Sequence, residues 1–153
     1  MNRIATLVNV LKQEWGHPRE AVHRGERCPF LLVCRFEDPR AQAIETFPFT
    51  IPEDVRQFWL ETNNATLFKD EQYGQWGVEV LGPTQALAET SRQSTARPKD
   101  FNRSDLILAR FFGDLDLLVI ACDPAQDDFG TVTIALPIDK RCDWPVVARS
   151  FSE

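Results

Sequence analysis

Five aspartates and no basic residue lie in FFGDLDLLVIACDPAQDDFG, residues 111–130. Clustered carboxylates can bind a divalent cation, serve as the acid and base of a hydrolase, attract a basic partner, or simply form the turns between strands. Each of these alternatives requires its own spacing. The residues concerned are Asp114, Asp116, Asp123, Asp127 and Asp128.

The spacing of these aspartates argues against metal-binding or catalytic chemistry. A calcium loop that starts at Asp123 lacks the glycine at its sixth position, and Ile134 stands where the last, bidentate glutamate is needed. The two histidines, His17 and His23, lie in polar segments, and the chain has neither a nucleophile elbow nor a phosphate-binding loop. We therefore expect no catalytic residue, no metal and no cofactor.

The acidic excess of the chain is concentrated in two segments. The formal charge is −6, from 17 Lys and Arg against 23 Asp and Glu. Residues 61–81 carry four acids against one lysine, and residues 111–130 carry five acids, so the remaining residues sum to a net +2. We predict that the two segments share one edge of a sheet and bind a basic protein. Aspartates that only form solvated turns are the alternative.

Aromatic residues accompany the charge in KDEQYGQW, residues 69–76. Aromatic anchors surrounded by charge are typical of protein interfaces, although core packing is an equal alternative for Trp76. Because phosphate neutralisation needs an excess of Lys and Arg, this acidic chain is not expected to bind nucleic acid. The predicted partner-binding residues are Asp70, Glu71, Tyr73, Trp76, Asp114, Asp116, Asp127 and Asp128.

Length and composition indicate a single domain, residues 1–153. The four cysteines have no zinc-binding spacing and are expected to be reduced. The N-terminus lacks the apolar core of a signal peptide, and no stretch approaches the roughly 18 apolar residues of a membrane span. These features predict a cytoplasmic protein that does not contact a membrane.

The hydrophobic patterns predict an α+β fold with a mainly antiparallel, twisted sheet of about five strands and helices packed on one side. Asn63 and Asn64 are expected to end the helix at 50–63 in a left-handed conformation. Trp144, Val147 and Phe151 are expected to dock an irregular or helical tail on the core. Helices are predicted at 3–15, 38–47, 50–63 and 84–93, and strands at 28–36, 75–83, 106–112, 116–122 and 130–136.

The order of motifs after residue 50 resembles that of the SUKH superfamily, which includes fungal cell-wall assembly regulators and many bacterial proteins. TIPEDVRQFWLETNNA is similar to its signature helix, and WGVEVLGPTQALAET to its strand-then-helix segment. LILARFFGDLDLLVIACD and FGTVTIAL resemble its central hairpin and next strand. The resemblance covers residues 50–152, whereas residues 1–49 add a helix and an extra strand. Asn63-Asn64 replaces the family's Asn-Gly, and Asp114-Leu115-Asp116 stands in place of its Gly-Gly-Asp.

The resemblance implies a non-enzymatic, protein-binding domain. In bacteria, such proteins are typically immunity proteins of polymorphic toxin systems, which bind and neutralise a co-encoded toxin, often a nuclease. A basic nuclease would suit the acidic segments, because complementary charge increases association rate and specificity. The alternative is a regulatory or scaffolding module that binds a cellular protein. The oligomeric state is left open.

Overall fold

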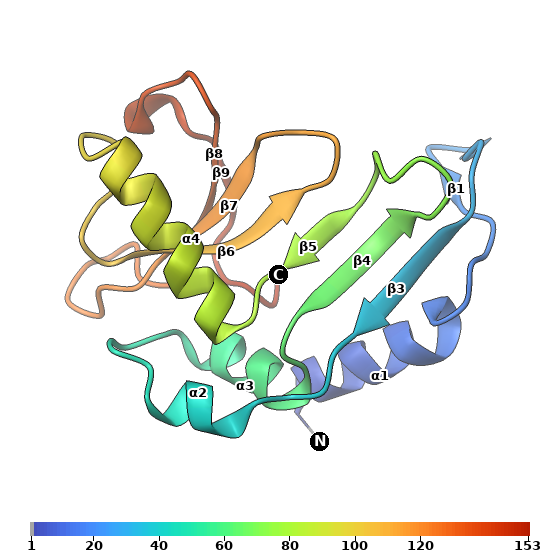
Figure 1. Cartoon of the computed structure of the whole chain (residues 1–153), viewed down its shortest axis with the longest axis horizontal. Helices are drawn as coiled ribbons and strands as arrows, with labels where there is room; N and C mark the ends of the chain where they lie inside the picture. Colours follow the sequence, from blue (N-terminus) through green and yellow to red (C-terminus); the bar gives the residue numbers. More distant parts are fainter. Residues whose placement is uncertain (1) are drawn as a thin grey trace.

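The computed structural model describes residues 2–153 as an α+β domain built on a seven-stranded antiparallel sheet (Figure 1). The strands follow one another in sequence order from β3 to β9, and a separate hairpin, β1–β2, lies beside β3. The elements are α1 (Arg3–Trp15), β1 (Val22–His23), β2 (Glu26–Arg27), β3 (Leu32–Phe36), α2 (Ala41–Glu45), α3 (Glu53–Glu61), β4 (Ala65–Asp70), β5 (Val78–Val80), α4 (Pro83–Ala96), β6 (Asp105–Phe111), β7 (Leu117–Ala121), β8 (Val132–Ala135), a 3-10 helix (Arg141–Asp143) and β9 (Val146–Ala148).

The predicted α+β class and antiparallel sheet are confirmed, with two differences in detail. The sheet has seven strands instead of about five, and the helices lie on two faces instead of one. In Figure 1, α4 crosses in front of β6, whereas α1 lies behind β3. Four successive β6 residues, Leu106 to Ala109, are buried because both faces of this strand are covered. Neighbouring side chains of a strand point to opposite faces, so an uninterrupted apolar run fits a strand covered on both sides.

The two additional strands, β4 and β9, have sequences that do not look like strands. The β4 sequence ATLFKD does not alternate regularly between polar and apolar residues. Most of the strand is only half-buried, and Phe68 has a positive φ of 52°. β9 has three residues and follows Pro145. Of the residues expected to dock the tail, Trp144 is buried and Phe151 packs on Phe58, but Val147 is half-exposed on β9.

A buried network of hydrogen bonds among Glu37, Asn63, Asn64 and Gly82, which we call the knot, joins the end of α3 to the sheet. Thr62 leaves the helix in an extended conformation with φ −159°, and neither Asn63 nor Asn64 has the expected left-handed conformation. Instead, both asparagine amides donate to the Glu37 carboxylate, at 2.9 and 2.8 Å. The Asn64 side-chain oxygen accepts from the Gly82 N–H at 2.6 Å. The knot therefore links the residues after β3, before β4 and before α4.

A second polar cluster holds the C-terminal segment against β6. The buried Asp105 carboxylate forms a two-bond ion pair with Arg141 and accepts from the Asn102 N–H at 2.7 Å. The Arg97 guanidinium donates to the carbonyls of Leu136 and Asp139, and both arginines lie over the Trp144 ring. The residues after β8 are thereby attached to the start of β6.

We expect Asp105→Asn to lower the free energy of unfolding by about 3 kcal/mol, because it leaves Arg141 without its buried counter-charge. Urea denaturation of the purified protein measures this loss. Arg27→Ala is the control, because Arg27 pairs with Glu20 where both side chains are more than half exposed, and such pairs contribute little. Equal losses for the two variants would contradict the structural role of the buried pair.

Gly82→Ala should destabilise the protein by roughly 1–3 kcal/mol, as expected for overpacking. A Cβ at this position would lie 2.8 Å from the Asn63 backbone carbonyl oxygen, which cannot move without disturbing the knot. Thr84→Ala, two residues later on an exposed part of α4, should change the stability by less than about 0.5 kcal/mol. The same urea titration compares both, and a fully stable Gly82→Ala protein would rule out the predicted overlap.

Candidate protein-binding site

Parts of the two acidic segments meet at one end of the sheet. The β4–β5 loop (71–77) lies beside the β6–β7 turn (112–116), and the Phe112 N–H donates to the Gly77 carbonyl at 3.0 Å. A Cβ on Gly113 would come within 2.7 Å of the Gln75 carbonyl oxygen, and Gly113 has a φ of +73°. Glycine is required at this contact by both space and conformation. We call the surface formed by residues 71–77 and 112–116 the loop end.

Two of the predicted binding residues have structural partners within the chain. Asp70 is fully buried, and its carboxylate accepts from the backbone N–H groups of Gln72, Tyr73 and Gln75 at 2.9, 2.8 and 3.4 Å. It shapes the β4–β5 loop and is not accessible to a partner. Glu71 is exposed but forms an ion pair with Arg35 of β3. Its charge is therefore largely compensated.

The aromatic residues of the β4–β5 loop are exposed. Tyr73 is 64% exposed and Trp76 49%, so core packing is the wrong interpretation of Trp76. Leu115, at the tip of the neighbouring turn, is 77% exposed. Single exposed apolar side chains are ordinary, but three large ones on adjacent loops are typical of an interaction surface.

Asp114 and Asp116 provide negative charge at the loop end. The exposed Asp114 carboxylate accepts from the Leu115 N–H at 2.7 Å, which fits the turn-forming role of aspartate. Partial burial and the neighbouring Asp114 raise the pKa of Asp116 above its ordinary value. Within residues 2–153, neither aspartate forms an ion pair. Their charge is available to a basic partner.

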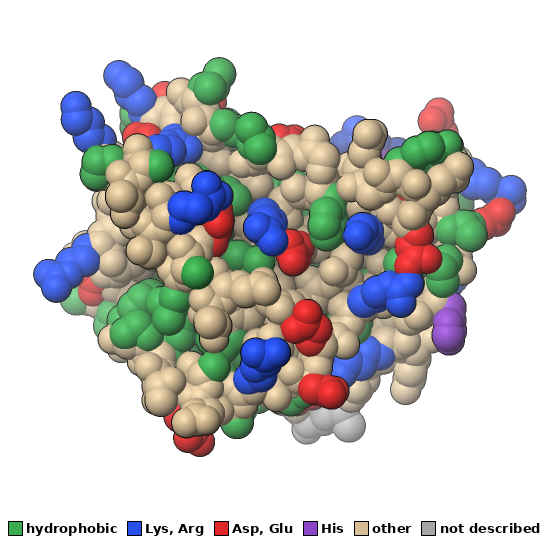
Figure 2. Space-filling model, viewed as in Figure 1, with side chains coloured by type: hydrophobic (Ala, Val, Ile, Leu, Met, Phe, Trp, Pro, Cys, Tyr) green, Lys and Arg blue, Asp and Glu red, His purple; other side chains and the backbone are tan. Residues whose placement is uncertain are grey.

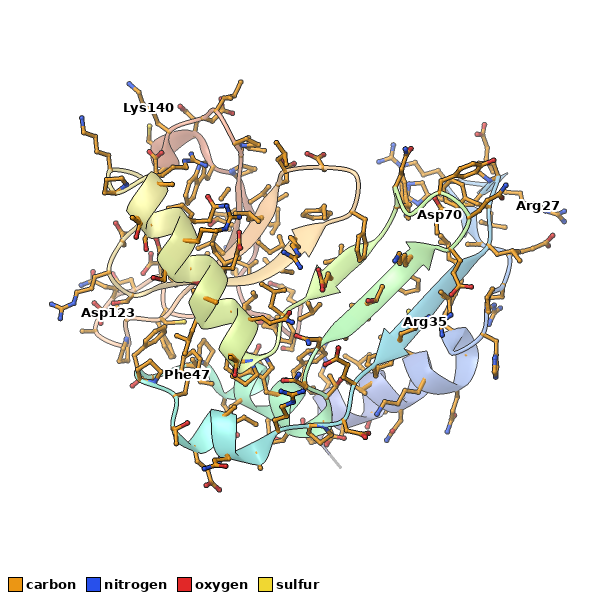
Figure 3. All side chains as sticks on the ribbon, viewed as in Figure 1. Arg27, Arg35, Phe47, Asp70, Asp123 and Lys140 are labelled. Carbon is orange, nitrogen blue, oxygen red and sulfur yellow. The ribbon has the colours of Figure 1, made fainter. Side chains whose placement is uncertain are left out.

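Asp127 and Asp128 lie at the opposite end of the sheet from the loop end, which corrects the prediction that all the aspartate turns share one edge. They belong to the β7–β8 connection, where they line a cavity of about 470 Å³ with Asp123 and Arg103. Figure 3 places Asp123 far from Asp70, on the other side of the molecule. In an antiparallel meander, successive turns alternate between the two ends, so neighbouring turns in the sequence are separated in space.

Sequence reasoning missed the β1–β2 hairpin, which packs against Trp76. His23 and Phe30 each place a ring centroid 6.4 Å from that of Trp76. The hairpin turns through Arg24 and Gly25, which have φ values of 52° and 80°. Two residues with positive φ are typical of a tight hairpin turn, and the Arg-Gly dipeptide was the available signal.

The broad face of the sheet between β3 and β6 is electrically mixed. Figure 2 shows Lys and Arg side chains interspersed with Asp and Glu on this side of the molecule. Across the strands, Arg110 pairs with Glu79, as Arg35 does with Glu71, and Arg92 pairs with Glu89 on α4. Because the charges compensate one another locally, this face attracts a basic partner less strongly than the loop end does.

The described residues, 2–153, contain no group of three or more His, Cys, Asp or Glu side chains placed to hold a metal ion. In the same range, no helix is both long and apolar enough to cross a membrane.

Comparison with known proteins decides the family. The model of the SMI1 / KNR4 family (SUKH-1) matches residues 41–153, which is most of the chain. The chain belongs to this family. Membership supports a protein-interaction domain in general terms. No curated protein and no solved structure matches the chain. Helix α1, the β1–β2 hairpin and β3 precede the region that the SUKH-1 model matches.

Proposed function

We propose that this SUKH-1 protein is a cytoplasmic, non-catalytic immunity protein that binds and neutralises a basic toxin domain of a nuclease type. The observation that supports it is the loop end, where uncompensated Asp114 and Asp116 adjoin exposed Tyr73, Trp76 and Leu115. Family membership supports a protein partner, and the charge of the loop end supports a basic one.

The physical basis of neutralisation would be occlusion. Nuclease sites that bind phosphates are rich in Lys and Arg. An acidic surface with aromatic anchors can cover such a site. A few buried residues, often Trp, Tyr or Arg, supply most of the affinity of a typical interface, whereas complementary charge accelerates association. Co-expression with the product of the adjacent gene tests the function directly: growth should be rescued by this protein, and the two should co-purify.

A pair of charge-matched variants tests the surface. Asp114→Asn/Asp116→Asn should slow association with the toxin about 5-fold at low ionic strength, because long-range attraction is reduced. Asp127→Asn/Asp128→Asn makes the same change in net charge at the opposite end of the sheet and should leave the association rate nearly unchanged. Surface plasmon resonance at two salt concentrations measures both, and the difference should shrink at high salt.

Two outcomes would contradict the assignment. If both double variants slowed association equally, only net charge would matter and the loop end would not be the contact surface. If the protein captured a cellular protein and gave no protection against any neighbouring toxin, a regulatory or scaffolding role would replace immunity.

A further inference from the structure

Trp76 stands between two depressions of similar size at the loop end. One, of about 340 Å³, lies on the side of the β1–β2 hairpin and is lined by His23, Glu26, Phe30 and Trp76 among others; we call it the hairpin pocket. The other, of about 380 Å³, lies toward the β6–β7 turn and includes Trp76, Phe112 and Asp114; we call it the turn pocket. Trp76 is the residue that lines both of them.

Aromatic side chains form part of the wall of both pockets. In the hairpin pocket, the Trp76 ring is tilted by 64° to His23 and by 47° to Phe30. The faces of aromatic rings carry a negative potential and attract cations. The protein uses this attraction itself at Phe112, one of the residues of the turn pocket, because the Lys69 ammonium lies 4.9 Å from the centroid of its ring.

Each pocket also contains one carboxylate without a basic partner. Glu26 lines the hairpin pocket and Asp114 the turn pocket, and neither forms an ion pair among residues 2–153. The one basic residue of the hairpin pocket, Arg27, is paired with Glu20 at 3.3 Å, and Figure 3 shows its side chain extending outward. An apolar wall with a carboxylate nearby suits a long basic side chain, whose methylene stem packs while its head is paired.

We propose that the two pockets bind two basic side chains from one exposed segment of the partner, one on each side of Trp76. This rests on the proposed function for the nature of the partner and adds which of its groups are recognised. The hairpin pocket is built mostly from residues before the region that the SUKH-1 model matches, whereas Trp76 and Asp114 lie within it. The hairpin therefore adds to the proposed site a part that lies outside the matched region.

Binding of short peptides to the full-length protein tests the two pockets without the toxin. The probe is a peptide with two arginines separated by one residue, and its matched control carries citrulline, which has the same shape without the charge. The readout is the indole N–H signal of Trp76 in a nitrogen-15 NMR spectrum, identified by its absence in Trp76→Phe. Trp59 and Trp144 are buried and serve as internal references for an intact fold.

We expect the arginine peptide to shift the Trp76 signal at millimolar concentration and the citrulline peptide not to. Glu26→Gln and Asp114→Asn should each weaken peptide binding roughly 2- to 5-fold, as for exposed charge pairs. Asp128→Asn, a carboxylate at the opposite end, should have no effect. Trp76→Ala should weaken binding more than Trp76→Phe, which keeps an aromatic face; here, binding is followed by other backbone signals of the loop end.

The proposal fails if the arginine peptide leaves Trp76 unshifted, or if arginine and citrulline peptides bind equally. These results are separate from the test of immunity. If the toxin binds with unchanged affinity to Trp76→Ala and Glu26→Gln, the two-pocket proposal is wrong although the immunity role stands. If the arginine peptide binds in a Glu26- and Asp114-dependent way but no toxin is neutralised, the pockets are real and the partner is another basic protein.

Discussion

The Glu37 carboxylate is the single acceptor on which the layout of the sheet depends. It accepts hydrogen bonds from the side-chain amides of Asn63 and Asn64. The side-chain oxygen of Asn64 in turn accepts a hydrogen bond from the Gly82 N–H. Buried amides without partners would each cost roughly 1–3 kcal/mol, so the chain after α3 has one satisfactory course. Along this course, β4 pairs with β3, and β5 pairs with β4 and leads into α4. The β4–β5 loop therefore lies at the end of the sheet away from the knot.

Periodicity and turn residues were sufficient to predict the α+β class, helix α1 and the three strands of the meander. They were insufficient for β4, whose sequence does not alternate regularly between polar and apolar residues, and for β9, whose three residues pair with β8. These segments are extended because they pair with neighbouring strands: β4 pairs with β3, which lies far away in the sequence, and β9 pairs with β8. Local propensity carries little of that information.

The candidate site was predictable in composition but not in arrangement. Counting charges identified Asp114 and Asp116, and the aromatic content of residues 69–76 added Tyr73 and Trp76, although core packing was an equal alternative for Trp76. It also included Asp70, which is buried as a loop-forming acceptor, and Asp127 and Asp128, which lie at the other end of the sheet. A sequence gives the number of charges in a segment. Whether a charged residue is buried, and at which end of the sheet it lies, depends on strand direction and loop geometry.

The strict agreement between strand order and sequence order has a consequence for how the protein folds. Strands β6 to β9 pair with their immediate successors, so the ends brought together are few residues apart and loop closure costs little entropy. β3 must instead wait for β4 across a long intervening segment that contains α2 and α3. The C-terminal meander can therefore close at a lower entropic cost than the β3–β4 pair, whose ends are separated by two helices.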